Sequence, residues 1–324
     1  MASARDIKSR IKSISNTKKI TKAMKMVAAS KMRKAVEAVL KTRTYANLSW
    51  QTVLNLSKTI KNNGQESLHQ LLTPRKEIKK VGIVLITSNR GLCGGFNMAI
   101  INKVNESIKK YQKTGEQTKI ETEFILVGKK GAVIYHYGHE IVADFPKLDL
   151  SSEVNEIVPV ANLIIDKYLS GKYDKVMVAY TDFVNAGKQI ARVKQILPIE
   201  IEQVDEYLGI VGEDTRIGLD KKFIEEKEEK YLHSGKFKFE YIFEPSPEEV
   251  LNEMLPRLIE IQLFQALLES NASEHSARMS AMHKATEAAG DMVNELTLSY
   301  NKARQADITA EIAEISAGAN ALNV

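Results

Sequence analysis

The first 63 residues contain neither glycine nor proline. These two residue types interrupt α-helices most strongly, so their absence over this length predicts one long helix. At 1.5 Å per residue such a helix is about 90 Å long, far longer than the average helix of a globular protein. Because a helix of this length must cover its apolar stripe, the sequence predicts a partner helix elsewhere in the chain.

Apolar residues recur along this stretch at spacings of three and four. Such a repeat averages about 3.5 residues, which is the period of a left-handed coiled coil. Many of the positions hold Ala or Met, so we expect a close but weakly held contact with the partner. The predicted seam consists of Ile7, Ile11, Ile14, Ile20, Met24, Val27, Met32, Ala35, Val39, Val53, Leu56 and Ile60.

A second long helical stretch starts near Ser246, which is the expected N-cap, with Glu248 and Glu249 in the first turn. We expect Pro256 to kink or locally break this helix. The two terminal stretches are predicted to pair as an antiparallel coiled coil, with both chain ends at one tip. The expected seam residues of the second helix are Met279, Met282, Thr286, Ala289, Val293, Leu296, Tyr300, Ala303, Ile308, Ile312, Ile315, Ala319 and Leu322.

Between the two helices, apolar runs typical of strands alternate with helical patterns. Strands are expected at 81–86, 124–127, 175–180 and 189–199, and helices at 97–113, 130–137 and 154–170. This alternation predicts a small Rossmann-like α/β domain with a mostly parallel sheet. The expected organisation is an N-terminal coiled-coil helix at 1–63, a central α/β domain at 78–200, an acidic insert and connector at 201–245, and a C-terminal coiled-coil helix at 246–324.

Charge is distributed unevenly along the chain. Between Arg5 and Arg43 there are thirteen Lys and Arg residues against two acids, Asp6 and Glu37. A solvated helix face explains this pattern, and so does a polyanionic partner such as nucleic acid. Nucleic-acid-binding surfaces commonly interleave aromatic residues with the basic ones, and the seam of this helix has none. A basic coiled-coil protein that binds nucleic acid is therefore kept as the alternative function.

The turn at 88–97, SNRGLCGGFN, follows the first expected strand, where a phosphate-binding loop lies in doubly wound domains. It lacks the Lys-Ser/Thr pair of a P-loop and the GxGxxG pattern of a dinucleotide site. We therefore favour a structural turn and keep a nucleotide-using enzyme as a second alternative. The six histidines show no metal-ligand spacing, and we expect no metal, no cofactor and no catalytic centre.

The remaining composition bears on location. No run of 18 apolar residues is present, so no transmembrane span is expected. The basic start of the chain lacks the apolar core of a signal peptide. The single cysteine, Cys93, cannot form an internal disulfide and is typical of a reducing compartment. These features favour the cytoplasmic side of a membrane or the cytoplasm.

Three separate parts of the chain resemble the gamma subunit of F-type ATP synthase. The matching motifs are RDIKSRIKSISNTKKITKAMKMVAASKMRKA at 5–35, RGLCGGFN at 90–97, and SEHSARMSAMHKAT at 273–286 with LSYNKARQADITAEIAEISAGANAL at 298–322. Asn89 departs from the family, which more often has Asp before Arg-Gly, at a turn that we expect to be structural. Three motifs in the family's order make the resemblance specific, and it covers the chain apart from much of 201–240.

The resemblance implies a rotor shaft. In that family the terminal helices form a coiled coil inside a hexamer of alternating alpha and beta subunits. The α/β domain lies against the epsilon subunit and the membrane c-ring, and the complex also contains a delta subunit. Rotation of the single shaft couples ion translocation to ATP synthesis without catalytic residues of its own. The implied location is the cytoplasmic face of the bacterial plasma membrane, as a peripheral subunit, with no nucleic acid bound.

The resemblance also implies which residues contact the beta subunits. Lys22, Met24 and Lys25 match the motif next to the beta segments that press on the shaft. A second group matches the tip that catches beta: Arg304, Gln305, Thr309, Glu311 and Glu314.

Residues 201–240 resemble, in position, an insert of cyanobacterial and chloroplast gamma subunits that regulates ATP hydrolysis. The cysteine pair of the chloroplast insert is absent here, which excludes a thiol switch. A mechanical brake on hydrolysis remains the hypothesis for this segment.

Overall fold

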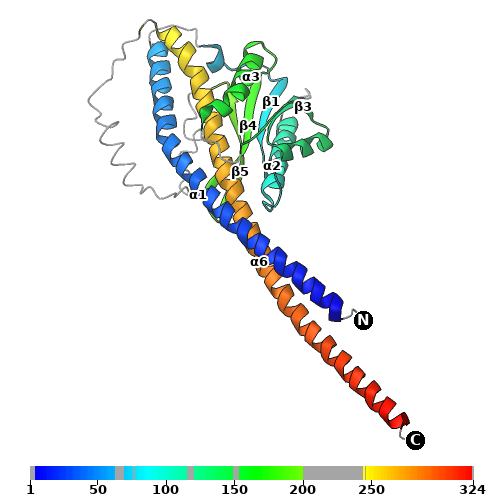
Figure 1. The fold of residues 1–324 in the computed structure, drawn as a ribbon. Helices are drawn as coiled ribbons and strands as arrows, with labels where there is room; N and C mark the ends of the chain where they lie inside the picture. Colours follow the sequence, from blue (N-terminus) through cyan, green and yellow to red (C-terminus); the bar gives the residue numbers. More distant parts are fainter. Residues whose placement is uncertain are drawn as a thin grey trace. The chain divides into compact units, whose positions relative to one another are not determined.

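The computed structural model describes residues 4–62, 69–75, 77–114, 120–148, 153–199, 244 and 246–322 (Figure 1). The chain divides into two compact units, Met1–Ala29 with Arg278–Val324, and Ser30–Ala277. Two long helices, α1 (Ala4–Asn62) and α6 (Pro247–Leu322), contribute to both units. We call the first the coil unit and the second the α/β unit. The predicted acidic insert at 201–245 lies outside the described residues, apart from Glu244.

The α/β unit contains a five-stranded sheet in the order β3-β2-β1-β4-β5. Neighbouring strands are parallel except for β5, which pairs antiparallel with β4 through a tight hairpin. This arrangement confirms the predicted mostly parallel α/β domain. The elements are η1 (Gln70–Leu72), β1 (Lys80–Ile86), α2 (Phe96–Thr114), β2 (Glu121–Val127), η2 (Lys129–Tyr137), β3 (Glu140–Phe145), η3 (Val154–Glu156), α3 (Val158–Leu169), β4 (Lys175–Asn185) and β5 (Lys188–Leu197).

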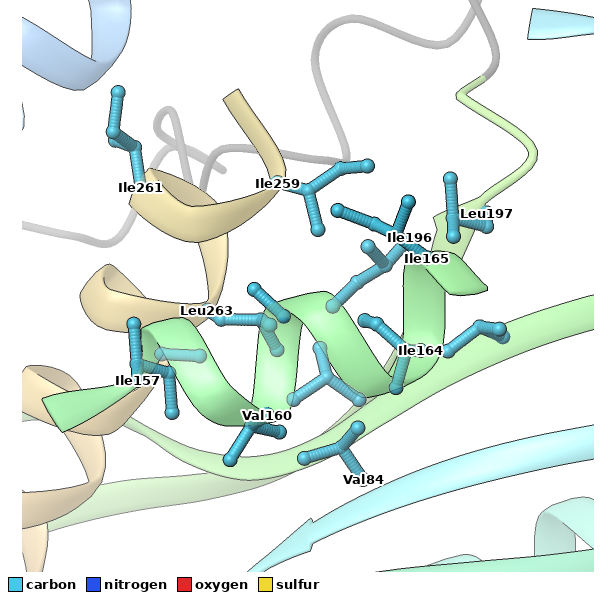
Figure 2. Close-up of a cluster of buried hydrophobic side chains, with 14 of the residues drawn as sticks. Val84, Ile157, Val160, Ile164, Ile165, Ile196, Leu197, Ile259, Ile261 and Leu263 are labelled. Carbon is cyan, nitrogen blue, oxygen red and sulfur yellow. The ribbon is translucent and has the colours of Figure 1, made fainter. Parts of the chain in front are cut away.

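Apolar side chains cover both faces of the sheet, as expected for parallel strands. On one face, α2 packs on alternate residues of β1, β2 and β4. On the other face, α3 and the first half of α6 pack on the intervening residues. Figure 2 shows this second cluster, with Val84 of β1, Ile164 of α3 and Leu263 of α6 among its members. The sheet therefore holds α6 directly against its core.

Helix α6 continues through Pro256 without interruption, so the expected break is absent. Proline removes one backbone donor and crowds the preceding turn, which normally destabilises a helix interior. Here the neighbouring side chains are fully buried: Leu255 is 0 % exposed, Leu258 1 % and Ile259 0 %. Tertiary packing against α3 and the sheet offsets the local cost of the proline.

Gly82 lies where the β1 backbone passes the ring of Tyr173. A Cβ atom at this position would be 2.7 Å from Tyr173 Cε2. Tyr173 is fully buried, so its ring has no free space into which to move. We expect Gly82→Ala to lower the free energy of unfolding by about 1–3 kcal/mol, the usual range for overpacking. Urea unfolding of the full chain measures this change.

Gly91 provides the matched control, because a Cβ there would have no atom within 4 Å. Gly91→Ala is expected to change the free energy of unfolding by less than about 0.5 kcal/mol. Equal effects of the two substitutions would contradict the close contact between Gly82 and Tyr173.

In the coil unit, α1 and α6 run antiparallel side by side, which confirms the predicted pairing (Figure 1). Three contacts define the register: Thr286 Oγ1 donates to Thr21 Oγ1 at 2.8 Å, Lys25 Nζ lies 3.3 Å from His283 Nδ1, and the Lys18 amino group lies against Gly290. Polar and small residues thus occupy the middle of the seam.

The structure corrects the predicted seam of α1. Ile20 and Val27 are 60 % and 56 % exposed, whereas Thr21 and Ala28 are 8 % and 1 % exposed. The buried positions continue the strict seven-residue repeat of Ile7 and Ile14, with Ile14 half-buried. The predicted seam instead used the most apolar residues, Ile20 and Val27, which are each one position away from the seven-residue repeat. Because the helix is regular, the same side continues to face α6, and the small residues Thr21 and Ala28 lie between the two helices.

Further along α1, Ala35 and Val39 are buried as predicted, and Met32 is half-buried. The side chains of Val53, Leu56 and Ile60 lie outside the described part of the chain.

The predicted seam of α6 is confirmed only as far as Ala303. Met282 and Ala289 are buried, and the other positions up to Ala303 are half-buried. Ile308, Ile312 and Ile315 are instead 46 %, 62 % and 66 % exposed. The side chains of Ala319 and Leu322 are not among those described.

The register explains why the seam ends there. In two contacts, Lys18 with Gly290 and Lys25 with His283, the two residue numbers add up to 308. The same sum places Ala4, the first residue of α1, opposite Arg304. Helix α6 continues for 18 further residues to Leu322, about 27 Å at 1.5 Å per residue. We call residues 304–322 the overhang. The prediction that both chain ends lie at one tip is therefore wrong.

Candidate functional site

The residues expected to contact a partner fall into two separate groups within the coil unit. Lys22, Met24 and Lys25 lie in the paired part of α1, opposite residues 283–286 of α6. The second group lies on the overhang: Arg304, Gln305, Thr309, Glu311 and Glu314. About 18 residues of α6 separate the two groups, which corresponds to about 27 Å. The chain therefore presents two surfaces rather than one site.

The first group is only partly available to a partner. Lys22 is exposed, whereas Met24 and Lys25 are half-buried. The Lys25 amino group lies 3.3 Å from His283 Nδ1, and His283 Nε2 lies 3.6 Å from Glu287 on the same helix. Lys25 thus contributes to the pairing of α1 with α6.

Sequence reasoning missed Ile20 and Val27, which are exposed on the same face of α1 because they are seven residues apart. The available signal was their departure from the strict heptad set by Ile7 and Ile14. Lys22, two residues after Ile20, lies about 200° around the helix from it, so the exposed side of α1 carries apolar side chains on one flank and a basic one on the other.

The second group lies on a fully exposed helix. Every residue from 304 to 316 is exposed, so nothing in the described chain covers any side of it. Thr309 Oγ1 donates to the Gln305 carbonyl at 2.8 Å, which leaves the other polar side chains directed to solvent. Ile308, Ile312 and Ile315 are spaced four and three apart and form one apolar stripe on this helix. Sequence reasoning assigned this stripe to the seam and so missed it as an outer surface.

The two helices of the coil unit carry opposite charge. From residue 4 to 29, α1 has eight Lys and Arg residues and one acid, Asp6. From 278 to 316, α6 has six acids and four Lys and Arg residues. An outer surface on α1 therefore favours an acidic partner, while the overhang offers charges of both signs.

The turn after β1 uses its polar groups internally. Ser88 N–H donates to Asn97 Oδ1 at 3.0 Å, Asn97 Nδ2 donates to Ser88 Oγ at 2.8 Å, and Ser88 Oγ donates to the Arg90 carbonyl at 2.8 Å. Cys93 is buried beside them, 3.4 Å from Asn97 Nδ2. This network supports the structural interpretation of the SNRGLCGGFN motif over a phosphate site.

One buried carboxylate lies near the amino ends of β1 and β2. Glu123 is 3 % exposed and lies 2.5 Å from Lys80 Nζ, and it accepts a hydrogen bond from Tyr173 OH at 2.7 Å. Burial alone raises the pKa of Glu123, but the Lys80 and Tyr173 hydrogen bonds and the charge of Lys172 bring it below its usual value. Burial and the Glu123 contact raise the pKa of Tyr173, so its phenol stays protonated.

The lowered pKa of Glu123 makes the stability of the fold pH-dependent. The stabilisation by Glu123 is fully present above the pKa that this carboxyl group has in the unfolded chain, about 4.3. It is lost as the pH falls through the lower pKa of Glu123 in the folded chain. We expect wild type to exceed Glu123→Gln in free energy of unfolding at about pH 6, and this difference to shrink towards about pH 3. Urea unfolding at a series of pH values measures it.

Glu121→Gln is the matched control, since Glu121 lies on the same strand with its side chain 72 % exposed, 3.5 Å from Lys80. It should show a much smaller difference from wild type at every pH. A constant difference between wild type and Glu123→Gln from pH 6 to 3 would contradict the account.

Two further kinds of site are absent from the described residues. No three His, Cys, Asp or Glu side chains are grouped so that they could hold a metal ion. None of the described helices combines the length and apolarity required to cross a bilayer.

Fold and exposed surfaces together define a class of protein: a helical stalk, longer on one helix than the other, attached to a small α/β domain. Residues 3–322 match the family model described as ATP synthase. The "ATP synthase gamma chain" of Herpetosiphon aurantiacus is 40 % identical over 100 % of both chains. That of Heliobacterium modesticaldum is 40 % identical over 99 % of this chain and 100 % of its own. The chain belongs to the ATP synthase gamma-chain family.

Solved structures share the fold at lower sequence identity. A chain of the Tetrahymena thermophila mitochondrial ATP synthase central stalk and c-ring is 22 % identical, with a TM-score of 0.55, over 82 % of this chain and 99 % of its own. A chain of the Euglena gracilis mitochondrial ATP synthase OSCP/F1/c-ring structure is 18 % identical, with a TM-score of 0.58, over 98 % and 94 %.

Proposed function

We propose that this chain is the central rotor shaft of an F-type ATP synthase. It transmits torque between a membrane c-ring and a hexamer of alpha and beta subunits, and so couples ion translocation to ATP synthesis. In this role the chain is a non-catalytic subunit present in one copy per complex. Family membership supports the proposal, as does the likeness to chains of solved central-stalk and rotor structures.

The observation that carries the proposal is the overhang. A helix that is exposed on every side from residue 304 to 316 and bears an apolar stripe is not stable as an isolated element in water. A surrounding sleeve of other subunits covers such a helix. Within that sleeve, Arg304, Gln305, Thr309, Glu311 and Glu314 form the polar contacts with beta.

The outer face of α1 is the second contact surface in this proposal. Ile20 and Val27 are exposed on one flank of α1 with Met24 half-buried beside them, and Lys22 lies on the other flank, so the outer side of the helix combines apolar area with positive charge. Such a face suits an acidic beta segment that presses on the shaft and moves away again, because exposed charge pairs bind weakly and exchange rapidly. Lys25 contributes less, because it is partly engaged with His283.

The α/β unit is the part of the rotor that meets the epsilon subunit and the c-ring, with delta elsewhere in the complex. This assignment makes the chain a peripheral subunit on the cytoplasmic face of a bacterial plasma membrane. The absence of a convergent catalytic group around the turn after β1 supports a mechanical role, since Ser88, Cys93 and Asn97 bond to one another.

Co-expression with the alpha and beta subunits of the same organism tests this function. We expect a stable complex with three alpha, three beta and one copy of this chain, separable by gel filtration and counted by native mass spectrometry. Alpha and beta subunits that co-purify with each other but never with this chain would overturn the proposal. Salt-sensitive binding of the free chain to DNA or RNA, without such a complex, would favour the nucleic-acid alternative.

A further inference from the structure

A short segment of α6 is buried although it is almost entirely polar. Residues 269–276 are each 4 % exposed or less, and Ala272 is the one apolar residue among them. The preceding stretch of α6, from Leu251 to Leu268, packs on the sheet mainly through apolar side chains. The polar segment is also the last part of α6 within the α/β unit, which ends at Ala277.

Three side chains of this segment bind three different parts of the α/β unit. Ser273 Oγ donates to the Thr181 carbonyl of β4 at 3.1 Å. Glu274 Oε2 accepts from Lys147 Nζ at 2.7 Å, beyond the end of β3. Ser276 Oγ donates to the Ala186 carbonyl in the β4–β5 turn at 2.7 Å. With 100° per residue, these three side chains leave α6 over an arc of about 160°.

The Lys147–Glu274 ion pair is the central member of this set. Its side chains are 2 % and 5 % exposed. Lys147 is held from two further directions: its amino group lies 5.9 Å from the Phe96 ring centroid, and its carbonyl accepts a hydrogen bond from the Asn89 side chain. The turn after β1 is thereby joined through Lys147 to α6.

Directional bonds and apolar contacts resist different movements. Apolar packing opposes separation of a helix from a sheet, but it is non-directional and gives less resistance to rotation of the helix about its axis. Hydrogen bonds and charge-assisted pairs weaken steeply when their geometry changes. Polar attachments spread over an arc therefore oppose rotation of α6 relative to the sheet.

We propose that residues 273–276 of α6 are the attachment through which torque passes between the α/β domain and α6, with Lys147 and Glu274 as its main positioning residues. The inference rests on the rotor function proposed above. It predicts that the attachment matters most when the motor works against a large opposing ion gradient, because the torque on it is then greatest.

The test uses the complete membrane complex carrying the double variant Lys147→Met with Glu274→Gln. Removing both charges avoids leaving one of them buried without its partner, so the variant is expected to fold and assemble. ATP hydrolysis and ATP-driven proton pumping are measured together at increasing opposing gradients. We expect the ratio of pumping to hydrolysis to fall by about twofold or more at the largest gradient, the usual scale for loss of a coupling contact. Hydrolysis with an uncoupler present should equal wild type.

Two further variants separate torque transfer from general stability. Lys147→Arg keeps the charge on a larger side chain and should retain more of the wild-type ratio than the double variant does. Asp182→Asn with Arg192→Met removes another ion pair of the α/β unit, 2.7 Å apart, that joins β4 to β5 and not to α6. It should leave the ratio unchanged. Wild-type pumping by the Lys147–Glu274 double variant at every gradient would overturn the inference, as would an equal loss in the Asp182–Arg192 variant.

A wrongly proposed rotor function would give a different experimental result from a wrongly assigned attachment. If the chain were not the rotor shaft, complexes containing the wild-type chain would themselves show no pumping that depends on this chain. If only the attachment were wrongly assigned, wild-type and variant complexes would pump equally well.

Discussion

Replacing Ile308, Ile312 and Ile315 together by glutamine is expected to weaken retention of the chain in the complex with alpha and beta about ten- to a hundred-fold. Each isoleucine contributes about 1.5–3 kcal/mol when fully buried. If the surrounding subunits bury the three side chains only enough to provide a third of their summed free energy, the loss of binding free energy is about 1.5–3 kcal/mol. This loss corresponds to the roughly ten- to hundred-fold weaker retention. Glutamine keeps the helix propensity of the overhang high, so lost apolar contact is the main effect.

The measurement is the exchange of an isotope-labelled chain out of the purified complex, followed by mass spectrometry. Ala306, Ala310 and Ala313 lie on the opposite side of the same exposed helix and provide the matched control. Glutamine at these three positions costs some contact inside the sleeve but leaves the apolar stripe intact, so exchange should increase much less than in the isoleucine variant. Exchange rates that do not differ between the two triple variants would contradict a covered stripe at Ile308, Ile312 and Ile315.

Leu263→Ala is expected to lower the free energy of unfolding of the full chain by about 2–5 kcal/mol. Leu263 is 0 % exposed and lies in the cluster between α6, α3 and the sheet shown in Figure 2. The substitution removes apolar contacts and leaves a cavity that the surrounding helix and strands can only partly fill. The effect is large because this cluster holds α6 on the sheet.

Leu298→Ala is the control, because Leu298 is on the same helix and 65 % exposed. Both substitutions change the helix propensity equally, so the difference between them isolates burial. The control is expected to stay within about 0.5 kcal/mol of wild type in urea unfolding followed by circular dichroism. A loss below about 1 kcal/mol for Leu263→Ala would show that α6 is not held by this cluster.

Much of the fold could be predicted from local pattern. The absence of glycine and proline indicated α1, and the buried runs at 81–86 and 124–127 indicated β1 and β2. β3 was missed because it is a short edge strand, half-buried along most of its length, and so lacks both a continuous apolar run and a strict alternation. Pro256 predicts a kink or a local break, but α6 is not interrupted there, because burial of its neighbours prevails over local propensity.

The partner-binding surfaces were less accessible to sequence reasoning. An apolar residue at three-four spacing looks the same whether it faces the other helix or a separate subunit. Ile20, Ile308 and Ile312 were therefore placed in the seam, although the register leaves all three exposed. That register depends on contacts between residues far apart in sequence, such as Thr21 with Thr286. Nothing in the local pattern of either helix specifies it.

Rotation of the chain within the alpha–beta hexamer is the property that a rotor shaft must have, and it can be observed directly. Cys93, the single cysteine, is buried, so a cysteine introduced at Tyr135, which is 69 % exposed, would be the one accessible thiol of the chain. A bead is attached there, and the alpha–beta hexamer is fixed to a surface. If the chain is the rotor shaft, the bead rotates in one direction on addition of ATP, in three equal steps per turn. A bead that only fluctuates about one angle while the same complexes hydrolyse ATP would contradict it.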